Sequence, residues 1–169
     1  MTNVIKLRLF RDSDLERIRF MENLQIRKLS KIRTSFQDDL QFINEIQKER
    51  GLPLISRNIW ESSDNNWVVY GGFIEDEIVC ITFLFPYCRI PHNDYPCGYI
   101  AELGGTYTLP KYRNKGIASK VIKEMLDNVK EDLPLLDAIV ADSTDDGYPI
   151  YKRYGFIDGE CHRIWKNKF

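Results

Sequence analysis

An amphipathic helix that follows a strand and a glycine-containing turn constrains the fold of this chain more than any other segment. Apolar residues occupy one face of this helix at the i, i+3, i+4, i+7, i+8 and i+11 positions, namely Ala118, Val121, Ile122, Met125, Leu126 and Val129. A helix with one apolar face is stable only when another element covers that face. The strands predicted on either side of it, at residues 98–108 and 135–141, can supply that element. Strand, helix and strand in this order indicate an α/β domain.

The rest of the chain extends this unit without a repeat or a long linker. Apolar runs predict further strands at residues 4–10, 67–74, 78–85, near residue 156 and at residues 161–166. Capping-box residues predict helix starts at Ser13 and Thr34, within a helix pair at residues 13–50, and a short helix follows at residues 147–154. Residues 54–66 predict a loop, and Gly104 with Gly105 predicts a bulge. We expect the order β-αα-βββ-α-β-α-ββ, with a mixed central sheet of about six to seven strands and about four helices.

Composition excludes several classes of protein. The 169 residues suit a single domain over residues 1–169, and 43% of them are hydrophobic, enough for a core. The net charge of −1 argues against binding to nucleic acid or to an anionic membrane, because either partner attracts an excess of positive charge. The longest apolar run is much shorter than the about 20 residues of a membrane helix. Four scattered cysteines predict reduced thiols, and no signal peptide is evident, so we expect a cytoplasmic protein.

A basic turn joins the strand at residues 98–108 to the amphipathic helix. Lys111, Arg113 and Lys115 are cationic, and Gly116 removes a side chain where the helix starts. The first amides of a helix have no acceptor within it and lie at the positive end of its dipole, so they attract phosphate. The turn is therefore a candidate phosphate site. The alternative is an ordinary strand-to-helix connection with solvated lysines.

A second segment, residues 142–156, follows the next strand and ends in Tyr151, Tyr154, Gly155 and Phe156. Taken alone, it predicts a capped short helix with core tyrosines. Together with the basic turn, it gives two motifs about 38 residues apart, R-x-x-G-x-A from Arg113 and Y-x-x-x-G-F from Tyr151. In this order and spacing the chain resembles the GNAT superfamily of acetyl-CoA-dependent N-acetyltransferases. The resemblance is detailed over residues 67–156 and topological elsewhere.

This resemblance implies an acyltransferase with a single GNAT-like domain and acetyl-CoA as its acyl donor. The pantetheine arm of coenzyme A would lie along Tyr107, Thr108 and Leu109 like an added strand, where the bulge parts this strand from residues 135–141. The diphosphate would accept hydrogen bonds from the amides of the turn and the first helical residues, namely Arg113, Asn114, Lys115, Gly116, Ile117, Ala118 and Ser119. Thr144 stands where many relatives have a cofactor-binding Asn. Its alternative role is to cap the next helix.

The resemblance also implies two catalytic residues. Glu102 matches the general base of some relatives and would act through water on an amine whose pKa lies near 10.4. The alternative is a strand carboxylate paired with Lys or Arg. Tyr151 matches the usual acid, with Tyr154 as the fallback and a packing aromatic as the alternative. The backbone around Tyr107 would stabilise the oxyanion.

Other chemistry has little support in the sequence. Cys88, His92 and Cys97 match no common zinc spacing, and we expect no metal. A cysteine nucleophile is possible through Cys80, Cys88 or Cys97, but no motif requires it, so we expect direct transfer.

The sequence leaves three alternatives for the acceptor. It is a small amine, or it is a protein Nα or Lys amine, or there is none because the chain is a non-catalytic acyl-CoA-binding module. Acidic residues near the expected cleft suggest a small cationic amine, namely Glu61, Asp64, Asp142, Asp145 and Asp146. The alternative is that these acids are solvated turn residues. A homodimer is possible, because relatives often form one.

Overall fold

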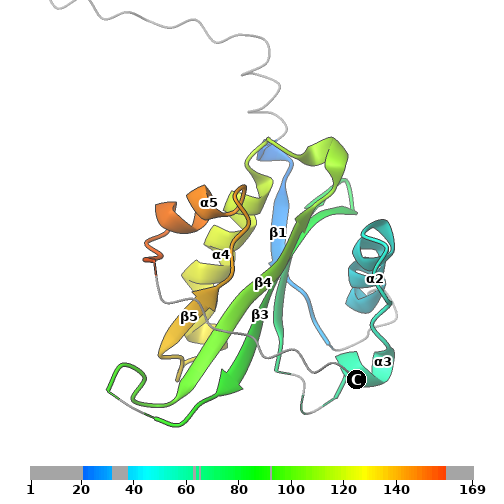
Figure 1. Ribbon diagram of the computed structural model, residues 1–169. Helices are drawn as coiled ribbons and strands as arrows, with labels where there is room; N and C mark the ends of the chain where they lie inside the picture. Colours follow the sequence, from blue (N-terminus) through cyan, green and yellow to red (C-terminus); the bar gives the residue numbers. More distant parts are fainter. Residues whose placement is uncertain (1–20, 32–37, 63, 65, 92, 159–169) are drawn as a thin grey trace, which may run out of the picture.

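A computed structural model describes residues 21–31, 38–62, 64, 66–91 and 93–158. These residues form a five-stranded sheet with helices on both of its faces (Figure 1). The elements in chain order are β1 (Gln25–Lys28), α2 (Asp39–Glu49), α3 (Arg57–Trp60), β2 (Val68–Ile74), β3 (Glu77–Cys88), β4 (Tyr99–Thr108), the 3₁₀ turn η1 (Pro110–Tyr112), α4 (Ile117–Asp132), β5 (Ala138–Ala141) and α5 (Tyr148–Arg153). The strands lie in the order β1-β2-β3-β4-β5. Only the β4–β5 pair is parallel, so the predicted α/β class and mixed sheet are confirmed.

The described residues contain slightly fewer strands than the six to seven that the sequence predicted. The strands predicted at residues 4–10 and 161–166 lie outside the described residues, and so do the helix starts at Ser13 and Thr34. Residues 156–158 are described and are not a strand.

The predicted helix pair at residues 13–50 is wrong for residues 25–28, which form β1. Ile26 packs against the core on one face of the sheet, whereas Arg27 stacks on Phe73, which belongs to the core on the other face. Neighbouring residues that serve opposite faces need the period of two of a strand. Pairing with β2 makes these residues a strand, and the helical spacing of apolar residues in the sequence did not reveal that pairing.

Two further differences concern short elements. The predicted loop at residues 54–66 contains the single turn α3, whose N-cap Ser56 accepts a hydrogen bond from the amide of Ile59 and whose Trp60 is buried. The strand predicted at residues 135–141 is shorter, and it is half-buried rather than buried. Leu135 is exposed because it lies in the turn after Pro134, and β5 is the last strand of the sheet among the described residues.

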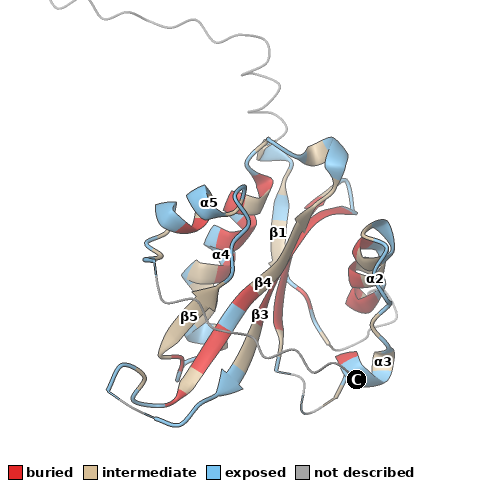
Figure 2. Cartoon of the chain, in the orientation of Figure 1, coloured by how far each residue is buried: buried red, intermediate tan, exposed pale blue. Residues whose placement is uncertain are grey.

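The sheet separates two apolar cores. One core lies against α4 and includes Val121, Ile122 and Met125, which are fully buried as the helical periodicity predicted. The other lies against α2 and includes Ile43 and Ile46. Figure 2 shows buried residues on both helices where they face the sheet.

A bulge in β4 determines the shape of the sheet near the candidate site. Pairing with β3 passes from Phe83 opposite Gly104 to Ile81 opposite Tyr107, so β4 carries one extra residue there. Gly105 takes a φ of 62°, which glycine adopts at low cost. β4 also pairs with β5 only as far as Leu103, although it continues to Thr108. The predicted bulge and the predicted parting of the two strands are therefore confirmed.

Candidate functional site

The end of β4 offers main-chain groups that β5 does not use. Residues 104–108 lie beyond the last β4–β5 pair and are half-exposed. The amide of Leu109 donates to Val79 on the β3 side, and strand residues alternate in the direction of their peptide groups. The carbonyl of Thr108 therefore points away from β3, where it accepts a hydrogen bond from Nε of Arg113 at 3.0 Å. An extended ligand can add to this edge as a further strand.

Tyr107 is held by two cations. The guanidinium of Arg113 lies 5.2 Å from the centre of its ring, and that of Arg50, at the end of α2, lies 5.3 Å from it. The sequence singled out Arg113 but not Arg50, because Arg50 reaches Tyr107 only through the packing of α2 against the sheet. Tyr107, Thr108 and Arg113 thus form one contiguous group.

The turn before α4 exposes the start of that helix. Gly116 is the N-cap and takes the left-handed conformation, with a φ of 83°. The first hydrogen bond of the helix runs from the amide of Lys120 to the carbonyl of Gly116. The amides of Ile117, Ala118 and Ser119 precede that bond and have no acceptor within the helix. Such amides at the positive end of a helix dipole can bind phosphate.

The cations near this turn are not equivalent. Lys111 donates to the Glu77 carboxylate at 2.8 Å, and this hydrogen bond is the largest cause of the lowered pKa of Glu77. Lys111 is therefore already paired. Arg153, from α5, donates to the Ser119 hydroxyl at 3.2 Å and so brings a guanidinium to the first turn of α4. Sequence reasoning missed Arg153, whose only signal is its place inside the Y-x-x-x-G-F motif.

The two tyrosines of that motif have different surroundings. Tyr151 is buried in the core on the α4 side, with its ring 5.4 Å from that of Phe156. Tyr154 donates its hydroxyl proton to the carbonyl of Ser119 at 2.8 Å. A proton already shared with a carbonyl is less available to a leaving group, so the geometry favours Tyr151 over Tyr154 as the acid.

Thr144 caps the turn before α5. Its hydroxyl accepts a hydrogen bond from the amide of Gly147 at 3.3 Å, and its carbonyl accepts from Gly147 and Tyr148. The side chain thus stabilises the turn before α5, whereas the N-cap of that helix is Gly147, not Thr144. Contact between Thr144 and coenzyme A stays a prediction.

Glu102 lies on the other face of the sheet from Tyr151. Its neighbours Ala101 and Leu103 belong to the same core as Tyr151, so Glu102 projects toward the α2 side, where it is exposed. It forms no ion pair with any residue that the structure describes. Glu102 and Tyr151 therefore lie on opposite faces of the sheet, and Glu102 is one residue before the last β4–β5 pair.

The remaining candidates do not form a second site. Within the described ranges, no cluster of three His, Cys, Asp or Glu residues could hold a metal, and His92 lies outside those ranges. Burial raises the pKa of the Cys80 thiol to about 12, so its thiolate is scarce. Glu61 is paired with Arg57 at 2.6 Å, whereas Asp142, Asp145 and Asp146 are exposed after β5.

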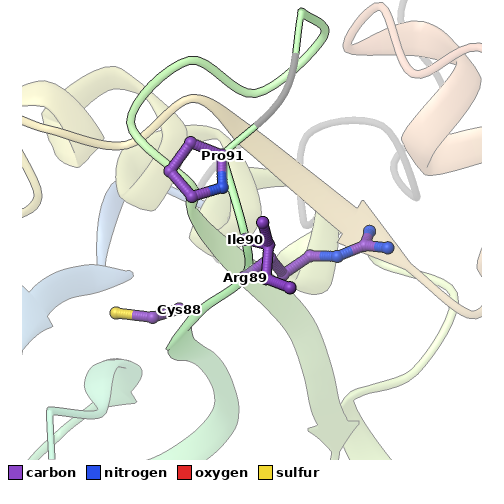
Figure 3. Close-up of a pocket in the computed structure, with 4 residues that line it drawn as sticks. All are labelled: Cys88, Arg89, Ile90 and Pro91. Atoms are coloured by element: carbon purple, nitrogen blue, oxygen red, sulfur yellow. The ribbon is translucent and has the colours of Figure 1, made fainter.

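Two surface cavities are formed mainly by other residues. One of about 540 Å³ is lined by Cys88, Arg89, Ile90 and Pro91 at the end of β3 (Figure 3). Another of about 410 Å³ lies between α4, β5 and residues 154–157. Neither is lined by Glu102, Tyr151 or Gly116. No helix in the described part of the chain is long and apolar enough to cross a membrane.

The parted strand pair thus gives this α/β domain an open strand edge beside an exposed helix start. The family model of the acetyltransferase (GNAT) domain matches residues 29–157, and the chain belongs to this family. The family confirms the resemblance found in the sequence and implies acyltransferase activity.

Solved structures share this fold. A predicted acetyltransferase from Clostridium acetobutylicum, determined with acetyl-CoA, is 21% identical, with a TM-score of 0.63 over 85% of this chain and 96% of that one. An aminoglycoside acetyltransferase from an uncultured soil metagenomic sample, in complex with sisomicin, is 14% identical, with a TM-score of 0.62 over 88% and 99%. A ribosomal-protein-alanine N-acetyltransferase from Brucella melitensis biovar Abortus is 14% identical, with a TM-score of 0.61 over 85% and 99%. These identities show the fold alone. No curated protein matches the chain.

Proposed function

We propose that this protein transfers the acetyl group of acetyl-CoA directly to a primary amine, and that the acceptor is a small cationic amine. The observation that carries the proposal is the position of Glu102 and Tyr151 on opposite faces of the sheet, with Glu102 one residue before β4 leaves β5. A thioester at this edge would have a carboxylate on one side and a phenol on the other.

Three sets of groups would bind the acetyl-CoA donor. The main chain of Tyr107, Thr108 and Leu109 would hold the pantetheine arm as an added strand. The amides at the start of α4 would hold the diphosphate, with Arg113 and Arg153 as nearby cations. Family membership and a fold neighbour determined with acetyl-CoA support acetyl-CoA as the donor.

The reaction removes two protons from the acceptor ammonium and supplies one proton to the leaving thiolate. Glu102, through water, would take a proton from the acceptor ammonium, because an alkyl amine with a pKa near 10.4 is protonated at neutral pH. The free amine would form a C–N bond to the acetyl carbon, its nitrogen would give a second proton to water, and the C–S bond would break. Main-chain amides at the open edge of β4 would stabilise the oxyanion, and Tyr151 would give its proton to the leaving thiolate.

A thiol-release assay tests this function. The purified chain is given acetyl-CoA and four acceptors: a small diamine, an aminoglycoside, a peptide with a free N-terminus and a peptide with an internal lysine. We expect release of the coenzyme A thiol with the small cationic amines. Release only with the peptides would make the protein a protein acetyltransferase. Tight coenzyme A binding without release for any amine would favour the non-catalytic module. The cytoplasmic location and a homodimer stay predictions.

A further inference from the structure

A row of aromatic side chains borders Glu102 on the α2-facing side of the sheet. Phe83, Phe85 and Tyr87 are alternate residues of β3 and share one face. The rings of Phe83 and Phe85 stack at 5.4 Å with an interplanar angle of 6°. Trp67, just before β2, meets Phe85 edge-on at 5.3 Å. Phe83 is buried, Phe85 and Trp67 are half-buried, and Tyr87 is 38% exposed, so the row runs from the core to the surface.

Glu102 faces the middle of this row. It pairs in register with Phe85, and Gly104 lies two residues further along β4 on the same face. A Cβ atom placed on Gly104 would lie 3.5 Å from the Phe85 ring and 3.6 Å from Oε1 of Glu102. The missing side chain of Gly104 therefore leaves a hollow with an aromatic ring on one side and a carboxylate oxygen on the other.

The charges around this hollow favour a cation. Glu102 has no ion-pair partner among the described residues. Arg89, the residue after β3, has its guanidinium over the ring of Tyr95 at 5.6 Å. The strand register places Tyr87 diagonally across from Glu102 on the same face. Burial raises the pKa of Tyr87, with an opposing contribution from Arg89 and a smaller raising one from Glu102.

We infer that Phe85, Tyr87 and Trp67, together with Glu102, form the subsite that holds the acceptor as its ammonium ion. An uncharged apolar ligand would bury the carboxylate without a partner, which costs free energy. An ammonium ion satisfies the carboxylate and also the negative faces of the rings. This inference rests on the proposed function and gives the cationic acceptor a structural basis independent of the acidic residues after β5.

Binding of a quaternary ammonium ion tests the subsite without requiring acetyl transfer. The probe is choline, and its control is the uncharged isostere in which carbon replaces nitrogen. Calorimetry on the wild-type chain should show choline binding about two- to thirtyfold tighter than the isostere, the range expected for a cation on aromatic rings. Equal affinities, or no binding of either compound, would overturn the inference.

Three variants test which residues produce the preference for choline. Tyr87→Leu and Phe85→Leu keep apolar bulk but remove the ring, and each should reduce the preference for choline several-fold. The methyl group of Gly104→Ala would make only ordinary van der Waals contacts with its neighbours. Because it would fill the hollow, this variant should bind both compounds more weakly. Tyr148→Leu, which removes an exposed tyrosine on α5, is the matched control and should change neither affinity. A preference for choline that survives both ring removals would also overturn the inference.

The outcomes separate this inference from the proposed function. Coenzyme A binding and acetyl transfer to amines, without any preference for choline, would leave the enzyme intact and refute the aromatic subsite. Absence of both coenzyme A binding and acetyl transfer would refute the proposed function, whatever choline does.

Discussion

Replacing Gly116 with glutamate tests the donor site with an internal control for backbone strain. Gly116 has a φ of 83° and Gly51, at the end of α2, has a φ of 66°. A residue with a side chain costs about 1–2 kcal/mol in either left-handed conformation. A Cβ atom at Gly51 meets nothing within 4 Å, so Gly51→Glu carries the strain without blocking anything.

The two variants share this backbone strain but should bind coenzyme A differently. For a domain of this size, the strain lowers the melting temperature by about 2–8 °C in each, and both should remain folded. At Gly116 the new carboxylate stands at the amides that would hold the diphosphate. Two unit charges 4–8 Å apart repel by about 2–4 kcal/mol at an effective dielectric constant of 20. Coenzyme A affinity should therefore fall about thirty- to a thousandfold in Gly116→Glu.

A melting curve first shows that each variant is folded. Calorimetric titration with coenzyme A then measures its affinity. Gly51→Glu should bind as the wild type does, and the deficit of Gly116→Glu should shrink in high salt, because salt screens exposed charges. A folded Gly116→Glu variant with wild-type affinity would refute the placement of the diphosphate at this turn.

Three more predictions follow from the site. Tyr151→Phe should lower kcat about 100- to 10,000-fold with nearly unchanged coenzyme A affinity, because only a proton donor is lost, and wild-type turnover would move the acid role to Tyr154 or to water. Glu102→Gln should depress the rate most at low pH, where the amine is most protonated, and an unchanged pH–rate profile would remove Glu102 from the mechanism. Cys80, whose thiol has a pKa raised to about 12 by burial, should resist iodoacetamide at pH 8 in the folded chain and react after unfolding, as peptide mass spectrometry would show. Modification of Cys80 at the rate of the exposed Cys88 would contradict its burial.

Local patterns predicted the elements that carry the site. The periodicity of α4 depends on residues close in sequence, and the glycine pair in β4 indicated the bulge because glycine adopts positive φ easily. β1 was mispredicted because its identity comes from pairing with β2, which helical spacing does not encode. The single turn α3 is too short for any period to show.

The missed parts of the site are products of tertiary packing. Arg153 reaches Ser119 only because α5 lies against the start of α4. The aromatic row beside Glu102 needs the register between β3 and β4, which places Phe85 opposite Glu102. Glu61 was predicted to attract the substrate, yet its charge is paired with Arg57 one helical turn away.

The crystal structure of the protein with coenzyme A would test the central claim most directly. The account predicts that the thiol sulfur lies at the edge where β4 leaves β5, within about 3–4 Å of the Tyr151 hydroxyl and with Glu102 on the opposite face of β4. A thiol remote from Tyr151, or coenzyme A bound instead in the cavity lined by Cys88, Arg89, Ile90 and Pro91, would contradict it.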